Sequence, residues 1–245
     1  MRFKAVVAYD GTDYGGYQIQ NNAPTIQADI ERVLAKLTNT EIRVLASGRT
    51  DAGVHAEGQV IAFDADWGHS VADLHRGMNA LLPSQIAVVE LSEVDARFHP
   101  RFDALSRSYR YTIYCAPVRD PMVDRYSLHV ARDLDVGAMA EATRCLIGRH
   151  DFEAFGSPPQ GDNAVRHVLG AEWTCDQQWL TFDIEADAFL YRMVRMLVGT
   201  LLRVGYGALL PEEFKEILDT RDRQKAGPAI TAKGLCLKSV TYASA

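Results

Sequence analysis

The sequence is poor in cysteine, which limits the kinds of cross-linked fold that it can adopt. Its 245 residues include four cysteines, and no two of them form a Cys-x-x-Cys pair. This spacing indicates neither a disulfide framework nor a zinc cluster. We therefore expect reduced structural thiols at Cys115, Cys145, Cys175 and Cys236.

Long apolar runs are also missing. A membrane-spanning helix needs about 20 consecutive apolar residues, and Arg195 and Arg203 interrupt the best candidate. The first ten residues include basic side chains, but their apolar run ends too early for a signal peptide. We therefore expect no membrane anchor and a cytoplasmic location.

The chain has no excess of positive charge. It contains 26 Lys and Arg against 32 Asp and Glu, which gives a formal charge of −6 and a pI near 5.6. This balance argues against nonspecific coating of nucleic acid, although a net charge does not describe a local surface. With 47% apolar and 24% charged residues, the composition is that of an ordinary globular protein of one or two domains.

The first half of the chain alternates between strand and helix patterns. Apolar periods of two residues indicate strands, and periods of about 3.6 indicate helices. Thr25 is a plausible N-cap, and Ser70 with Asp73 resembles a capping box. The pattern predicts strands at 3–9, 41–46, 59–65 and 85–94, with helices at 26–38 and after Ser70.

This order is β-α-β-β-α-β, the ferredoxin-like arrangement, and the second half repeats it. There we expect strands at 107–116, 164–175, 178–186 and 235–242, and helices at 135–147, 189–206 and 211–219. The prediction is an α/β fold of the α+β type, with two ferredoxin-like halves at residues 1–100 and 101–245. A central cleft between them is a usual place for a ligand.

The most informative segment connects two predicted strands and runs from Ala46 to Gln59. It holds three glycines, an Arg, an Asp and a His, and loops this long are commonly functional. Asp51 lies between small residues, so a bulky substrate can approach its carboxylate. Arg49, two positions earlier, favours the ionised form. An ionised, accessible carboxylate is a nucleophile or a base.

Two other interpretations of this segment stay open. Asp51 can cap a turn and pair with Arg49, which is how most loop Asp residues are used. Asp51 with His55 can supply two ligands to a metal-dependent hydrolase, but no second His or Cys cluster completes the set. For His55 we favour a hydrogen-bonded structural role.

A second segment, residues 97–114, is basic and aromatic. It contains Arg97, Arg101, Arg107 and Arg110 against Asp103 as the acid, interleaved with Phe, His and Tyr. This composition is typical of places where phosphates and unstacked bases bind. Tyr111 and Tyr114 are better explained as sheet core, whereas Tyr109, at the start of the strand, is the better candidate for base stacking.

A third segment, residues 188–205, is apolar at helical spacing but carries Arg192, Arg195 and Arg203 without an acid. Such arginines are usually solvated charges on a helix face. Arg195, however, follows Val194 in a strongly apolar stretch, and a partly buried arginine needs an acidic partner. Asp51 is a possible one.

The three segments together resemble the tRNA pseudouridine synthase A family. The most specific match is Gly48-Arg49-Thr50-Asp51-Ala52-Gly53-Val54-His55. Supporting matches are Arg107-Ser108-Tyr109-Arg110-Tyr111, Ala188-Phe189-Leu190 and Met193-Val194-Arg195, and the resemblance runs from Tyr9-Asp10-Gly11 to Gly234-Leu235.

The resemblance implies two domains of the pseudouridine synthase fold, a homodimer, and a positively charged cleft for tRNA. It makes Asp51 the essential aspartate, Tyr109 the ring that contacts the target base, Arg195 the ionic partner of Asp51, and Arg49 a residue that helps hold the flipped nucleotide. The implied substrates are uridines at tRNA positions 38, 39 and 40, in the anticodon stem-loop. No metal or other cofactor is implied.

The sequence departs from the family pattern in the first loop. The family often has Gly-Trp-Gln where this chain has Gly16-Tyr17-Gln18, a ring-for-ring change that should preserve packing. The alternative from another class is a noncatalytic RNA-binding protein that uses the same basic and aromatic strands. Asp51 argues against it, because an anion in a phosphate-binding cleft weakens binding and makes sense chiefly as a reagent.

Overall fold

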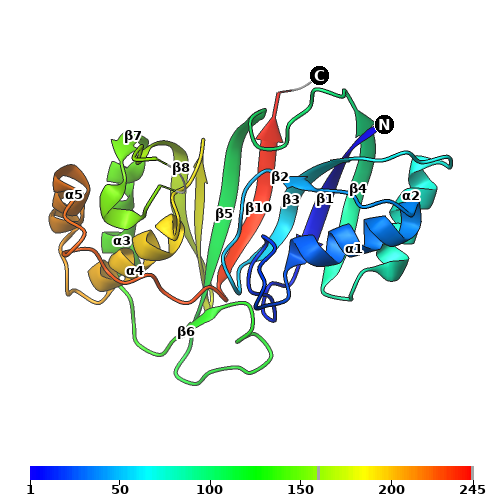
Figure 1. The fold of residues 1–245 in the computed structure, drawn as a ribbon. Coiled ribbons are helices and arrows are strands. Elements are labelled where there is room, and N and C mark those ends of the chain that lie inside the picture. The colour runs from blue at the N-terminus through cyan, green and yellow to red at the C-terminus, as the bar shows by residue number, and fades with distance from the viewer. Residues whose placement is uncertain (159–160, 244–245) are drawn as a thin grey trace. The chain divides into compact units, whose positions relative to one another are not determined.

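The computed structural model describes residues 1–158 and 161–243. They form two compact units, Met1–Leu105 with Cys236–Ala245, and Ser106–Leu235. The expected mixed α/β class is confirmed (Figure 1). The last strand, which the sequence pattern assigned to the second half, belongs to the first unit. Within that unit Cys236 pairs with His55, and local patterns do not reach that far along the chain.

The first unit is a sheet covered by two helices. Its strands are β1 (Arg2–Tyr9), β2 (Leu45–Ala46), β3 (His55–Asp64), β4 (Ile86–Val94) and β10 (Leu235–Tyr242), and its helices are α1 (Ile26–Thr38) and α2 (Val71–Leu81). The order is β4-β1-β3, with β2 antiparallel and β10 parallel to β3. The β4-β1-β3-β2 order is that of a ferredoxin-like fold.

Alternating residues of β1 form the centre of the first core. Phe3, Ala5, Val7 and Tyr9 are buried, because successive side chains of a strand point to opposite faces of the sheet. Helix α1 supplies Ile30 and Leu34 to this core, and both helices lie along the sheet (Figure 1).

The predicted helix caps of this unit are confirmed. The Thr25 side chain accepts a hydrogen bond from the Ala28 N–H (3.4 Å). Ser70 and Asp73 form the reciprocal capping box at the start of α2.

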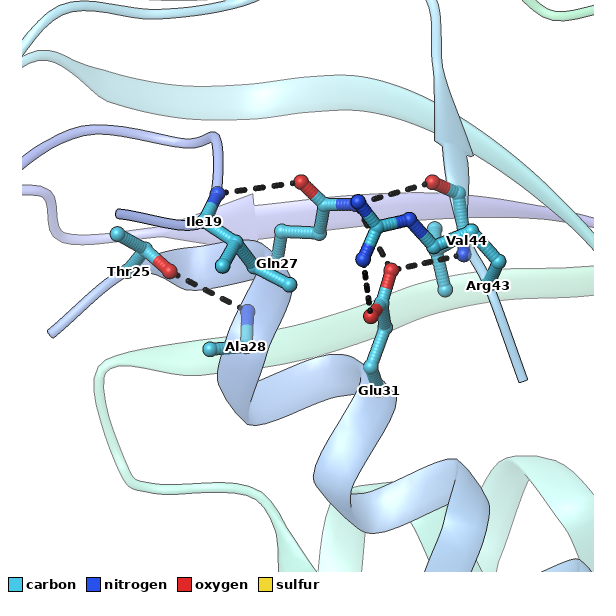
Figure 2. Close-up of polar contacts among 7 residues, drawn as sticks. All are labelled: Ile19, Thr25, Gln27, Ala28, Glu31, Arg43 and Val44. Atoms are coloured by element: carbon cyan, nitrogen blue, oxygen red, sulfur yellow. Dashed lines mark hydrogen bonds and ion pairs between the residues drawn. The ribbon is translucent and has the colours of Figure 1, made fainter. Parts of the chain in front are cut away.

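The predicted strand at 41–46 is shorter than expected. The strand is confined to Leu45–Ala46, because side chains of α1 hold the main chain before it (Figure 2). The Gln27 amide donates to the Val44 carbonyl (3.3 Å), and the Val44 N–H donates to Glu31 (3.0 Å). Gln27 also accepts from the N–H of Ile19 (3.2 Å), so α1 ties the first loop to the segment that leads to Asp51.

The second unit is a mainly antiparallel sheet with three helices beside it (Figure 1). Its strands are β5 (Ala104–Cys115), β6 (Leu128–Val130), β7 (Gly148–Asp151), β8 (Val165–Asp176) and β9 (Trp179–Ala186), and its helices are α3 (Val136–Thr143), α4 (Met193–Gly205) and α5 (Pro211–Thr220). The order is β5-β9-β8-β7, with β6 parallel to β5. Tyr111, Ile113, Phe182 and Ile184 of this sheet are buried, as are most residues of α4.

Two predicted helices of this unit are shorter than expected. Helix α4 starts at Met193 rather than at 189, since Arg192 has a left-handed φ of 62° and Tyr191 pairs with Ser157 in an isolated β-bridge. Helix α3 ends at Thr143 and is followed by a 3-10 turn at Arg144–Leu146. Strands β6 and β7 are only three and four residues long, too short to give a periodic signal.

Candidate active site

Asp51 lies on the segment between β2 and β3, and its side chain is partly exposed. The main chain is fixed on both sides of it. The Thr50 carbonyl accepts from the Tyr17 N–H (3.1 Å), and the Asp51 carbonyl accepts from the Val54 N–H (3.1 Å), which closes a tight turn. Gly53 has a φ of +76° in this turn and donates its N–H to the Tyr14 carbonyl (3.3 Å). The loop therefore presents the carboxylate from an ordered backbone.

Two glycines of the first loop make this ordering possible. A Cβ on Gly11 would lie 2.0 Å from the Val54 carbonyl oxygen, and one on Gly16 would lie 2.9 Å from the Thr50 carbonyl oxygen. Gly16 also has a φ of +111°, which side chains disfavour. The sequence analysis did not assign these two residues to the site. The three glycines at positions 11, 15 and 16 are the signal that could have located them.

His55 opens β3 and is buried, with 6% of its surface exposed. The Gly11 N–H donates to its Nδ1 (3.2 Å), so Nδ1 acts as an acceptor. Asp10 Oδ1 also lies 3.2 Å from Nδ1, but an accepting nitrogen has no hydrogen to give it. This geometry agrees with the structural role expected for His55. Within residues 1–158 and 161–243, no group of three or more His, Cys, Asp or Glu side chains could hold a metal ion.

Arg49 is exposed and precedes Asp51 by two residues in the same segment. It lies between Gly48 and Thr50, of which Thr50 is buried.

Tyr109 lies on β5 in the second unit and is partly exposed. Its ring contacts that of Phe189 edge to face, with centroids 5.0 Å apart and planes at 81°. Tyr111, two residues on, is fully buried and donates its hydroxyl hydrogen to the Thr231 carbonyl (2.9 Å). Tyr111 is thus confirmed as a core residue, whereas Tyr114, which the sequence pattern also assigned to the core, is only half-buried beside the rings of His129 and Trp179.

Arg195 lies in the first turn of α4 and is held by residues 227–231. Its Nε donates to the Ile230 carbonyl (2.7 Å), and the Ile230 N–H donates to the Arg195 carbonyl (3.3 Å). The segment can approach the helix closely because Gly199 has no side chain. A Cβ at this position would lie 2.1 Å from the Pro228 carbonyl oxygen. Arg195 is therefore ordered by main-chain groups of its own unit, a feature that the sequence did not reveal.

The site residues fall into two groups. Asp51 and Arg49 share one loop of the first unit, whereas Tyr109 and Arg195 belong to the second unit. The pairing of Asp51 with Arg195 stays a prediction.

The chain is similar to known proteins over nearly its whole length. A family model described as tRNA pseudouridine synthase matches residues 5–103 and 142–243. The chain is 45% identical to tRNA pseudouridine synthase A of Moorella thermoacetica over 244 residues, covering 98% of each protein. It is 45% identical to the Brevibacillus brevis protein of that name, covering 98% of this chain and 99% of the relative. The Geobacillus kaustophilus protein of that name is 43% identical, with 98% and 94% covered.

The chain therefore belongs to the tRNA pseudouridine synthase family, and it is an isomerase that acts on tRNA. The family assignment confirms the resemblance based on the segment around Asp51, and it disfavours the alternative of a noncatalytic RNA-binding protein. Among the described helices, none is both long and apolar enough to span a membrane.

Proposed function

We propose that this enzyme converts uridine to pseudouridine in the anticodon stem-loop of tRNA, with Asp51 as its essential catalytic residue. The observation that carries the proposal is the ordered loop around Asp51. Hydrogen bonds hold its main chain on both sides while the carboxylate stays partly exposed. Preorganised charge of this kind is what a reacting centre needs.

The reaction requires a carboxylate and a site that keeps the detached base bound. The N1–C1′ glycosidic bond breaks, the base rotates, a C5–C1′ bond forms, and the proton on C5 leaves while N1 gains one. The ionised Asp51 serves this reaction either by adding to C1′ of the sugar or by assisting deprotonation at C2′. Both routes need a base that has left the helical stack and stays bound while it is detached.

Tyr109, Arg49 and Arg195 have supporting roles in this proposal. Extruding a base costs a few kcal/mol, and stacking on a ring such as Tyr109 returns about 1–3 kcal/mol. Arg49, exposed beside Asp51, helps hold the flipped nucleotide. Arg195, ordered by Ile230, is the ionic partner of the carboxylate. We also infer a homodimer in the cytoplasm, in line with the resemblance, and light scattering on the purified protein tests the dimer.

The central test replaces Asp51 by Asn, which keeps the shape of the side chain and removes its charge. We expect no turnover, measured as tritium release from tRNA labelled at uridine C5, with the circular dichroism spectrum and tRNA binding retained. Asp66→Asn is the matched control, since Asp66 is an exposed residue beyond the end of β3, and it should retain full activity. Full activity of Asp51→Asn would reject the assignment.

A further inference from the structure

A cluster of four buried polar side chains underlies the Asp51 loop. Tyr9 is 4% exposed, Ser47 2%, Thr50 7% and Gln59 0%. Tyr9 is the last residue of β1, Gln59 lies within β3, and Ser47 and Thr50 belong to the loop itself. Burying polar groups costs free energy unless hydrogen bonds satisfy them. Four buried polar side chains at one place therefore suggest a specific role for their hydrogen bonds.

Hydrogen bonds join the four side chains in one network. The Ser47 hydroxyl donates to Gln59 Oε1 (2.7 Å), and Gln59 Nε2 donates to the Gly48 carbonyl (3.0 Å). A carbonyl accepts only, so this contact fixes which end of the Gln59 amide is the nitrogen. The same Nε2 lies 3.4 Å from the Tyr9 hydroxyl oxygen, and the Tyr9 and Thr50 hydroxyls are 2.8 Å apart.

One direction in the network follows from these donors. Because Gln59 Nε2 can only donate, the Tyr9 oxygen accepts from it, whereas either hydroxyl can donate in the bond between Tyr9 and Thr50. Burial raises the pKa of Tyr9 from 10.0 to about 12, so the phenol keeps its hydrogen at neutral pH. The network thus forms hydrogen bonds with residues 47, 48 and 50, three of the four residues that precede Asp51.

We propose that Tyr9 and Gln59 are positioning residues that hold the Asp51 loop in its reactive geometry through Ser47, Gly48 and Thr50. The inference rests on the proposed role of Asp51, and neither residue contacts substrate in it. A displacement of about 1 Å at a reacting group can cost a hundredfold in rate. The network acts on the loop from the sheet side, whereas the Tyr17 N–H holds the Thr50 carbonyl from the first loop.

Tyr14 offers a matched control for Tyr9. It is also a buried tyrosine of the first unit with a pKa raised to about 12, and its hydrogen bond to the loop, from the Gly53 N–H, is made by its main-chain carbonyl, which a substitution to Phe keeps. Its hydroxyl donates to Asp29 (3.0 Å) on α1 instead. Removing that hydroxyl takes away a hydrogen bond of similar kind without touching the network.

The test compares Tyr9→Phe with Tyr14→Phe in steady-state tritium release from tRNA labelled at uridine C5. We expect Tyr9→Phe to lower kcat between about tenfold and a hundredfold, with KM and tRNA binding unchanged. Tyr14→Phe should keep the wild-type kcat. Equal kcat values for wild type and Tyr9→Phe would overturn the proposal, and so would an equal loss in both variants.

A second pair of variants covers the case in which Tyr9→Phe fails to fold. Thr50→Ser keeps the hydroxyl that bonds to the Tyr9 hydroxyl, and Thr50→Val removes it at nearly constant volume. We expect Thr50→Ser to retain kcat within about twofold and Thr50→Val to lose it as Tyr9→Phe does. Equal kcat in the Ser and Val variants would contradict the proposal.

The two proposals fail in different ways. Full activity of Asp51→Asn overturns the catalytic role of Asp51 and, with it, the reason for positioning this loop. An inactive Asp51→Asn beside a fully active Tyr9→Phe overturns only the positioning role and leaves Asp51 as the catalytic carboxylate.

Discussion

Replacing Gly16 by Ala should damage both the fold and the reaction, because Gly16 lies directly against the main chain of Thr50 and Asp51. Its φ of +111° lies where a side chain costs about 1–3 kcal/mol. The added Cβ would lie 2.9 Å from the Thr50 carbonyl oxygen, 3.2 Å from the Ala52 nitrogen and 3.3 Å from the Asp51 carbonyl carbon. All three are main-chain atoms, so the two loops must separate to make room.

The two costs are measured by separate assays. Urea denaturation should show a loss of about 2–3 kcal/mol in the free energy of unfolding, the strain of φ plus part of the contact. Single-turnover tritium release should show at least a tenfold lower rate in protein that remains folded, because the separation moves Asp51. Binding of tRNA should change little.

Gly68→Ala is the control for this variant. Gly68 lies between β3 and α2, and among the described residues no heavy atom beyond Gly68 and its two chain neighbours lies within 4 Å of an ideal Cβ there. Its stability and rate should match those of the wild type. If Gly16→Ala changes the unfolding free energy by less than about 0.5 kcal/mol, the normal range for surface substitutions, and leaves the rate within twofold, the close approach of the loops is refuted.

Two further predictions concern tyrosines. Tyr109→Phe should keep base stacking and activity, whereas Tyr109→Ala should raise the Kd for tRNA about tenfold or more. Filter binding measures this Kd. Unchanged binding in the Ala variant would make Tyr109 a core residue that packs on Phe189. Because the Tyr9 pKa is raised from 10.0 to about 12 in the folded state, the unfolded chain loses this proton more readily. The wild type should therefore lose about 3 kcal/mol of stability relative to Tyr9→Phe between pH 10 and 12, with a constant difference below pH 10, as measured by urea denaturation; a constant difference up to pH 12 would contradict the raised pKa.

Local signals predicted the elements whose causes are local. The Thr25 cap and the Ser70–Asp73 capping box act within one helical turn, and the sequence located both. The start of α4 depends instead on the bridge between Ser157 and Tyr191, which are 34 positions apart. Nothing near residue 190 records that contact, so the apolar periodicity extended the helix too far.

The candidate site divides in the same way. Asp51 was found by its residue type, its small neighbours and the charge of Arg49, all of which lie in one segment. The atoms that hold this segment in place come from elsewhere in the chain: the main chain of Tyr14 and Tyr17, and the side chain of Gln59. Sequence patterns therefore predict the candidate catalytic residue but not the residues that hold it in position, because hydrogen bonds between distant segments produce no periodicity in the sequence.

Main-chain groups hold the Asp51 loop at Tyr17, so a tyrosine in place of the family's usual tryptophan can keep the loop in position. Tyr17 anchors the loop through its N–H to Thr50 and its carbonyl to Gln27 (2.9 Å), and any residue with that backbone conformation supplies both groups. Its ring is buried, 3% exposed, with its centroid 6.4 Å from that of Tyr9. The hydroxyl has no hydrogen-bond partner among the described residues, a cost to stability that falls on the core and leaves both anchoring bonds in place. The position of Asp51 therefore depends on main-chain geometry at residue 17 rather than on which aromatic ring stands there.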